Sequence, residues 1–118
     1  MTSRAEYGKQ AEEMAAAYLE ERGYEIKARN YRIRAGEIDI VAKRYGWLVF
    51  VEVKARASVN YGYPREAVTL AKQARIIRAA NMYLMETGLT ESSIRFDVIE
   101  VHGSKINHWP NAFDATGN

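Results

Sequence analysis

Two acidic residues and a lysine stand in the most strand-like part of the chain. The segment GEIDIVAKRYGWLVFVEVK, residues 36–54, carries Asp39, Glu52 and Lys54 among its valines and isoleucines. Because side chains alternate along a strand, Glu52, Lys54 and Arg56 share one face. Carboxylate oxygens are the ligands that Mg²⁺ prefers, and an amine beside such an ion can position a water molecule or neutralise charge on phosphorus. The residue types therefore predict a metal site that acts on a phosphate substrate.

The register of the two strands decides whether the acids meet. A two-residue turn at Tyr45 and Gly46 would close a hairpin in which Asp39 lies directly opposite Glu52. Directly opposed Cβ atoms are about 4.5–5.5 Å apart, so the two carboxylates repel each other unless a cation lies between them. A shift of one residue would place them on opposite faces. We expect Mg²⁺ or Mn²⁺ as that cation.

The same register offers an alternative without metal. It places Glu37 opposite Lys54, so that the charged residues could form an ordinary salt-bridged strand pair. Glu37 and Asp39 would then share one face of their strand, and Ile38 and Ile40 the other.

Hydrophobic periodicity and turn residues predict the elements that must position these side chains. The expected bounds are a helix from about Arg4 to Arg22, strands from Tyr24 to Asn30, Gly36 to Ala42 and Trp47 to Arg56, a helix from about Arg65 to Thr87, a strand over residues 93–102 and a short strand over residues 105–113. Pro110 limits the last strand to an edge or an end. The order α-β-β-β-α-β-β indicates an α/β domain with helices packed on a central mixed sheet.

The second long helix has two predicted faces. Leu70, Ile77 and Leu84 recur every seven residues and are expected to form its buried stripe. Its basic residues Arg65, Lys72 and Arg75 cluster on the opposite side and are expected to face away from the core. A basic stripe of this kind suits a phosphate backbone, and solvated surface charge is the alternative.

Composition bounds the class of protein. The chain has 118 residues, which predicts one domain, and it contains no cysteine, which excludes disulfides and thiolate metal sites. No apolar run approaches the roughly 20 residues of a membrane span, and the N-terminus has no signal-like core, so we expect a cytoplasmic protein. The net charge of +2 is small, but residues 22–34 hold five basic residues and one acid. This asymmetry permits a basic face.

The spacing D-x(12)-E-V-K, made by Asp39, Glu52, Val53 and Lys54, resembles the core signature of the PD-(D/E)xK nuclease superfamily. That superfamily includes type II restriction enzymes and the archaeal Holliday junction resolvases. Ile38 stands where the nominal motif has proline.

Nearly the whole chain is also similar to a widespread bacterial family of small proteins of unknown function, grouped with those resolvases. The matching motifs are A-x-x-Y-L before a glycine (Ala15, Tyr18, Leu19, Gly23), N-x-R (Asn30, Arg32), GEID, FVEVKAR, E-A-V with a downstream lysine (Glu66, Ala67, Val68, Lys72), R-F-D-V at residues 95–98 and N-A-F at residues 111–113.

The resemblance implies a restriction-endonuclease-like core and a metal-dependent endonuclease that hydrolyses phosphodiester bonds in DNA, including branched DNA. Asp39 and Glu52 would bind the metal and Lys54 would assist the attacking water. A first-helix glutamate joins the metal site in the resolvases, which makes Glu12 the candidate for a third carboxylate and Glu13 the weaker option. The resolvases act as dimers, so a homodimer is expected.

Two other functions remain open. One is a nucleic-acid-binding module that has the nuclease fold without turnover and acts with a partner. The other is an assembly factor, which would explain the fold but not the paired acids. The candidates for contact with nucleic acid are Arg56, Lys72, Arg32, Arg34, Arg65 and Arg75. The loop at residues 61–63 is a candidate substrate flap. His102 and His108 are expected to be structural, and Asp97 to pair with a neighbouring Arg or Lys.

Overall fold

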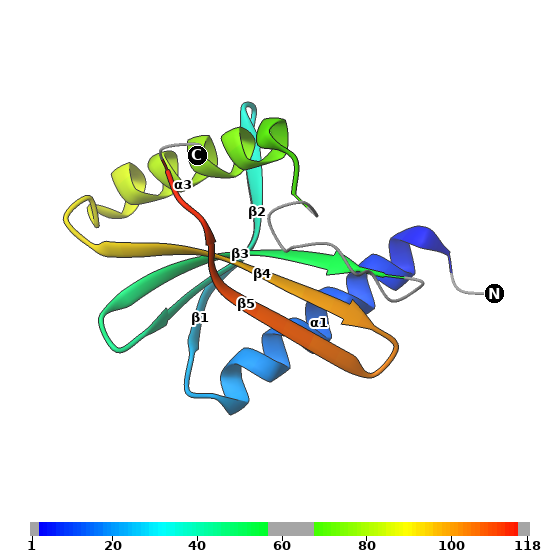
Figure 1. The fold of residues 1–118 in the computed structure, drawn as a ribbon. Helices are drawn as coiled ribbons and strands as arrows, with labels where there is room; N and C mark the ends of the chain where they lie inside the picture. The colour runs from blue at the N-terminus through cyan, green and yellow to red at the C-terminus, as the bar shows by residue number, and fades with distance from the viewer. Residues whose placement is uncertain (1–2, 57–67, 116–118) are drawn as a thin grey trace.

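A mixed five-stranded β-sheet forms the centre of the computed structural model, which describes residues 3–56 and 68–115 (Figure 1). The strands lie in the sheet in chain order: β1 (Glu25–Ile33), β2 (Gly36–Arg44), β3 (Trp47–Ala55), β4 (Ser93–His102) and β5 (Lys105–Phe113). The β3–β4 pair is parallel and its neighbours in the sheet are antiparallel. The expected order α-β-β-β-α-β-β and the mixed sheet are confirmed.

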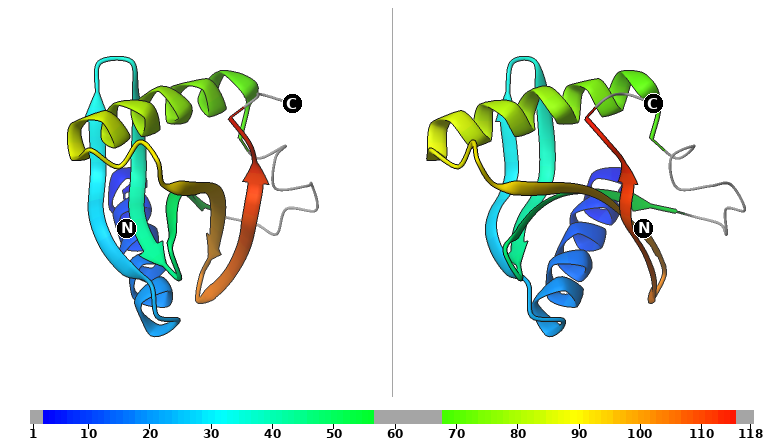
Figure 2. Two further views of the ribbon diagram at one scale, coloured as in Figure 1. Left: turned by 90° about the vertical axis from the view of Figure 1, so that its left-hand side faces the viewer. Right: turned by 60° about the vertical axis from the view of Figure 1, so that its left-hand side comes forward.

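Within the described ranges, two helices cover opposite faces of this sheet (Figure 2). Helix α1 (Arg4–Glu21) packs Ala15 and Leu19 against Val49 and Val51, whereas α3 (Leu70–Thr87) packs against Phe50 on the other face. Because β3 is buried on both sides, its apolar residues run continuously rather than alternating with polar ones. Neither helix of the described chain combines the length and the apolar composition that a membrane-spanning helix needs.

Helix α1 begins and ends as its sequence predicts. The side chain of Ser3 accepts a hydrogen bond of 3.1 Å from the backbone N–H of Glu6, which satisfies a free N–H of the first turn. Gly23 follows the helix with φ of 87°, a left-handed conformation that glycine adopts without steric cost. Ala11, Ala15 and Leu19, on the side of the helix that faces the sheet, are buried.

Helix α3 begins at Leu70, so the prediction of a start near Arg65 was wrong. Thr69 is the N-cap, with a side chain that accepts a hydrogen bond of 3.1 Å from the N–H of Lys72. Arg65 and the loop at residues 61–63 lie outside the described residues.

The predicted buried stripe of α3 was wrong at Leu70, which is 68% exposed, whereas Leu84 is buried as predicted and Ile77 packs against the core. The buried positions are Gln73, Ile76, Ala79, Ala80, Tyr83 and Leu84. A seven-residue spacing drifts around a helix of 3.6 residues per turn, and two adjacent alanines allow closer approach to the sheet than the larger side chains would.

The hairpin of β1 and β2 bends beside Asp39. Ile38 belongs to the core cluster under α3 and Ile40 to the cluster under α1, so the prediction that they share a face was wrong. At the same level of β1, Asn30 has a left-handed φ of 52°, which interrupts the strict alternation of an extended strand. The outer part of the hairpin therefore turns toward α3 (Figure 2).

Strand β5 has the predicted bounds, residues 105–113, and Pro110 lies in it. β5 is an edge strand of the described sheet, which confirms the expected place for this proline.

Candidate functional site

Strands β2 and β3 pair at their closed end and separate at Asp39 and Glu52. Their ladder of partners runs from Arg44–Trp47 to Ile40–Val51, with the expected two-residue turn at Tyr45 and Gly46. Asp39 and Glu52 are the next residues on the two strands, directly beyond the last paired residues of the ladder. We call this pair of residues the acid fork.

The acid fork holds its two carboxylates against each other. The backbone N–H of Val53 donates a hydrogen bond of 2.7 Å to Asp39 Oδ2, which ties the Asp39 side chain to the opposite strand. Glu52 is buried, with 4% of its surface exposed. Burial, followed by the charge of Asp39 and a hydrogen bond with it, raises the pKa of Glu52 to about 8. The pair is therefore an electrostatically unfavourable arrangement that a cation would stabilise.

Glu12 approaches the fork from α1. Its Oε1 atom is buried and has no hydrogen-bond partner. Burial and the charge of Asp39 raise the pKa of Glu12, while Arg29 and Asn30 act in the opposite direction. Among the described residues there is no group of three or more His, Cys, Asp or Glu side chains arranged to hold a metal ion. The structure thus joins Asp39 and Glu52 and brings Glu12 near them without completing a three-carboxylate cage. Glu13 is exposed.

Two lysines flank Glu52. Lys54 Nζ lies 3.5 Å from Glu52 Oε2, and Lys72 Nζ lies 4.0 Å from the same oxygen. Lys54 comes from β3 itself, whereas Lys72 comes from the first turn of α3. A lysine in the first turn is unfavourable for the helix dipole, so its place there depends on the acids that it meets.

Glu37 pairs with α3 and not with Lys54, which corrects the alternative strand pair. Lys72 Nζ donates to Glu37 Oε1, and Arg75 Nη2 donates to Glu37 Oε2 at 2.8 Å. The bonds to Arg75 and Lys72 lower the pKa of Glu37 to about 2. The carboxylate therefore stays charged at neutral pH and holds both cations.

The basic residues of α3 consequently do not face away from the core as predicted. Lys72 and Arg75 turn toward β2, because the buried stripe of the helix is centred on Ile76 and Ala80 rather than on Leu70. This orientation places Lys72 beside the acid fork, 4.0 Å from Glu52 Oε2.

Gly36 explains the glycine of the GEID motif. A Cβ atom at this position would lie 1.9 Å from the backbone oxygen of Arg75, which is shorter than any real contact. The start of β2 therefore touches the backbone of α3, and only glycine permits this approach.

The remaining candidates for nucleic-acid contact differ in whether their side chains are bonded within the fold or exposed to solvent. Arg56 donates to Glu100 Oε2 at 3.0 Å, and its carbonyl accepts from the Tyr7 hydroxyl at 2.7 Å. Arg32 and Arg34 are exposed near the end of the β1–β2 hairpin. The structure thus leaves Arg32 and Arg34 open to solvent and engages Arg56 within the fold.

A second polar cluster, which sequence reasoning missed, lies on the α1 face. Asp97 is fully buried and bonds Arg95 Nε at 2.8 Å, His108 Nε2 at 2.7 Å and the backbone N–H of Asn111 at 2.9 Å. The other ring nitrogen of His108 bonds the Tyr18 hydroxyl at 3.2 Å. The expected pairing of Asp97 with an arginine is confirmed, but no spacing in the sequence links it to His108.

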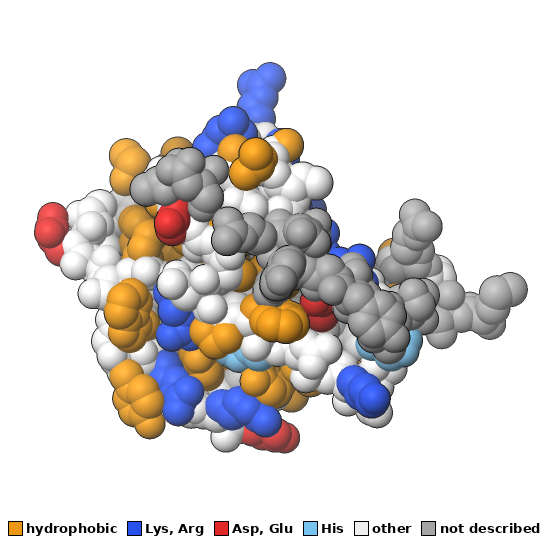
Figure 3. Space-filling view, viewed as in Figure 1, with side chains coloured by type: hydrophobic (Ala, Val, Ile, Leu, Met, Phe, Trp, Pro, Cys, Tyr) orange, Lys and Arg blue, Asp and Glu red, His pale blue; other side chains and the backbone are white. Residues whose placement is uncertain are grey.

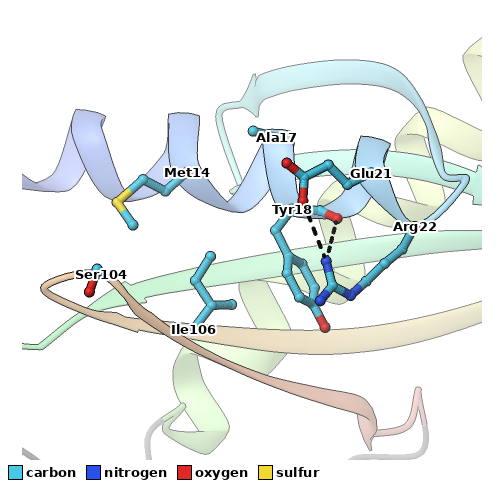
Figure 4. Close-up of a pocket in the computed structure, with 7 residues that line it drawn as sticks. All are labelled: Met14, Ala17, Tyr18, Glu21, Arg22, Ser104 and Ile106. Carbon is cyan, nitrogen blue, oxygen red and sulfur yellow. Dashed lines mark hydrogen bonds and ion pairs between the residues drawn. The ribbon is translucent and has the colours of Figure 1, made fainter.

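A shallow pocket of about 410 Å³ lies beside this cluster, between α1 and the β4–β5 hairpin (Figure 4). Met14 and Ile106 line its apolar part, and the Tyr18 ring lies under the Arg22 guanidinium. The pocket contains no residue of the acid fork.

Comparison with known proteins identifies relatives over most of the chain. The model of the family described as "Uncharacterised protein family UPF0102" matches residues 11–101. A UPF0102 protein of Lachnoclostridium phytofermentans is 54% identical over 105 residues, which cover 88% of this chain and 89% of the relative. UPF0102 proteins of Desulfosudis oleivorans and Syntrophotalea carbinolica are 47% and 46% identical, covering 98% and 97% of this chain and 95% and 96% of the relatives.

Proposed function

The chain belongs to the uncharacterised protein family UPF0102, and from the geometry of the acid fork we propose that it is a metal-dependent endonuclease acting on DNA. The observation that carries the proposal is the contact between Asp39 and buried Glu52 at the point where β2 and β3 separate. Two carboxylates in this position reduce the stability of the fold, so their placement calls for a role other than packing.

The side chains at the fork suit a divalent cation with oxygen ligands. Asp39 and Glu52 offer converging carboxylates, and Glu12 offers a buried oxygen without a hydrogen-bond partner. Mg²⁺ and Mn²⁺ typically take one or two protein carboxylates together with water and phosphate oxygens. Asp39 and Glu52 would hold the ion, with Glu12 as a further ligand or through a water molecule. The ion would polarise the phosphate and lower the pKa of a bound water.

The nearby cations have separate roles in this proposal. Lys54, beside Glu52 on β3, would orient the attacking water and offset negative charge that develops at phosphorus. Lys72 and Arg75, held in place by Glu37, would contact the neighbouring phosphates of the bound strand. Arg32 and Arg34 would extend this contact along the outer hairpin.

Cleavage assays with site variants test the proposal. With Mg²⁺ or Mn²⁺, the wild-type protein should nick supercoiled DNA and cut a four-way junction. Because each residue acts at the reacting phosphate, Asp39→Ala and Lys54→Ala should each lower the rate by at least about 100-fold. Lys105→Ala, at the exposed start of edge strand β5, provides a surface control matched to Lys54→Ala and should retain full activity. Cleavage that persists unchanged in both site variants would remove the acid fork as its source.

A second candidate function is a nucleic-acid-binding module without turnover. The observation that favours it is that the described residues lack a group of three metal-ligating side chains. Lys72 and Lys54 would then serve as the permanent cations of the fork. Calorimetric titration with Mg²⁺ and Mn²⁺ separates the two candidates. Metal binding by the wild type that Asp39→Ala abolishes supports the enzyme. A wild-type protein that binds neither ion supports the binding module.

A further inference from the structure

A row of rings in edge-to-face contact, with guanidinium groups over them, crosses the α1 face of the sheet and reaches the closed end of the β2–β3 hairpin. We call it the Arg–Tyr row, and its members in spatial order are Arg22, Tyr18, His108, Tyr24, Arg44 and Tyr45. The Arg22 guanidinium lies 3.8 Å from the Tyr18 ring centre, and the Tyr18 and Tyr24 rings lie 5.5 and 6.2 Å from that of His108. The Arg44 guanidinium lies between the rings of Tyr24 and Tyr45, at 5.1 and 4.6 Å.

Both ends of the Arg–Tyr row are open to solvent. Tyr45 is 87% exposed, and Trp47, the partner of Arg44 in the ladder, is 43% exposed. At the other end, half of the Arg22 side chain is exposed beside the shallow pocket (Figure 4). Figure 3 shows hydrophobic and basic side chains interleaved at the lower left of the molecule, over the region of the β2–β3 turn.

The geometry of the turn does not account for a tyrosine at position 45. Its φ of 50° and the φ of 81° at Gly46 form a turn with two left-handed residues, for which Asn-Gly is the favoured sequence. A bulky residue with positive φ is conformationally unfavourable. The ring buries little surface in return, so a smaller residue would serve the turn better.

We propose that the Arg–Tyr row binds single-stranded DNA. The exposed ring of Tyr45 offers a flat face on which an unpaired base stacks, and Arg22, Arg44 and exposed Lys43 complement the phosphate charge. Paired bases present no free face to such rings, so a duplex does not use the surface in this way. The pocket beside Tyr18 is large enough for one base between the Arg22–Tyr18 stack and the apolar side chains of Met14 and Ile106.

This inference deepens the proposed function and rests on it for its consequence, because it makes an unpaired strand part of the nuclease substrate. The acid fork lies where the β2–β3 hairpin opens and Tyr45 where it closes. The strand held by the row is thus separate from the phosphodiester bond at the fork. Binding to the row needs no metal and no cleavage, so it is measurable independently.

Fluorescence anisotropy with labelled oligo(dT) in EDTA tests the row. Loss of one stacked base weakens single-strand binding by about 5- to 100-fold, and we expect this loss for Tyr45→Asn and for Arg22→Ala. Tyr45→Asn should also raise the melting temperature, because asparagine suits the turn. A variant that is more stable yet binds more weakly separates recognition from folding. Met85→Ala, which removes a 68% exposed apolar side chain from α3, should leave binding unchanged.

Three outcomes would overturn the inference. They are no binding of oligo(dT) by the wild type, undiminished binding by Tyr45→Asn, or a dimer in light scattering that Tyr45→Asn dissociates, which would make the row an interface between two copies. Alternatively, the wild type binds oligo(dT) through Tyr45 and cleaves none of the DNA substrates. That result would refute the proposed nuclease activity and support the single-strand binding site.

Discussion

At the level of single residues, Glu52 shows how the fold keeps a destabilising group. Valine would fit the strand at this position, yet a glutamate is buried beside Asp39 and near two lysines. Burial of a carboxylate next to a second one is unfavourable unless opposite charge compensates it. The lysines supply part of that compensation, and the proposed metal ion would supply the rest.

The raised pKa of Glu52 predicts a specific dependence of stability on pH. Glu52 ionises near pH 4.5 in the unfolded chain and near pH 8 in the folded chain, so the unfolded state binds fewer protons between these values. The free energy of unfolding should therefore fall as pH rises from about 4.5 to about 8, and stay lowered above that. Glu52→Gln should remove this decline. Thermal unfolding followed by circular dichroism from pH 5 to pH 9 measures the difference, and equal profiles for both proteins would contradict the assignment.

Metal addition extends the same experiment. At pH 8, Mg²⁺ or Mn²⁺ should raise the melting temperature of the wild type, because an ion that binds only the folded, ionised fork stabilises it. Glu52→Gln should show a much smaller shift. A wild-type melting temperature that is insensitive to both ions would argue against the metal site.

At the level of elements, the contact between β2 and α3 positions the cations of the fork. Gly36 touches the backbone of α3 at Arg75, and the next residue, Glu37, bonds Lys72 and Arg75. A steric contact and a pair of charge-assisted hydrogen bonds thus set the position of the first turns of the helix. Lys72 reaches Glu52 as a result.

Two glycine substitutions test this contact. Gly36→Ala should destabilise the protein by about 1–3 kcal/mol, because its Cβ would overlap the Arg75 carbonyl and force the strand and helix apart. Gly8→Ala is the matched control in α1, where a Cβ meets no atom within 4 Å. It should stabilise the helix by up to about 1 kcal/mol. Urea unfolding measures both, and a Gly36→Ala protein as stable as the wild type would show that the approach is not required.

At the level of the whole molecule, the described chain holds two acidic centres with different physical character. Asp97 on the α1 face is satisfied by Arg95, His108 and a backbone N–H, and its pKa is lowered by the bonds to His108 and Arg95 despite burial. The acid fork contains one carboxylate pressed against another. The first arrangement stabilises the fold, whereas the second reduces its stability.

Opposite mutational effects should distinguish these two centres. Asp97→Ala leaves Arg95 and His108 without their buried acceptor and should cost about 3–5 kcal/mol of unfolding free energy. Asp39→Asn removes a repulsive charge and should leave stability at pH 8 unchanged or higher. Urea unfolding of both variants, followed by circular dichroism, gives the comparison. Similar losses in the two variants would show that the fork is a structural centre as well.

The sequence by itself determined the features that depend on neighbouring residues. Period-two and helical spacing predicted the order of the elements, and the Tyr45–Gly46 turn predicted the register that brings Asp39 to Glu52. These features follow from local backbone geometry, which the residues within one element or one tight turn decide.

Only the tertiary structure determined which side chains from different elements form ion pairs and hydrogen bonds with each other. Glu37 and Lys72 are 35 residues apart in the chain, and Asp97 lies 11 residues from His108 on another strand. The seven-residue repeat of α3 predicted a buried Leu70, but close packing of its alanines against the sheet rotated the helix and brought Lys72 toward the fork. Such contacts depend on how two surfaces fit together, and the pattern of either surface alone does not encode that fit.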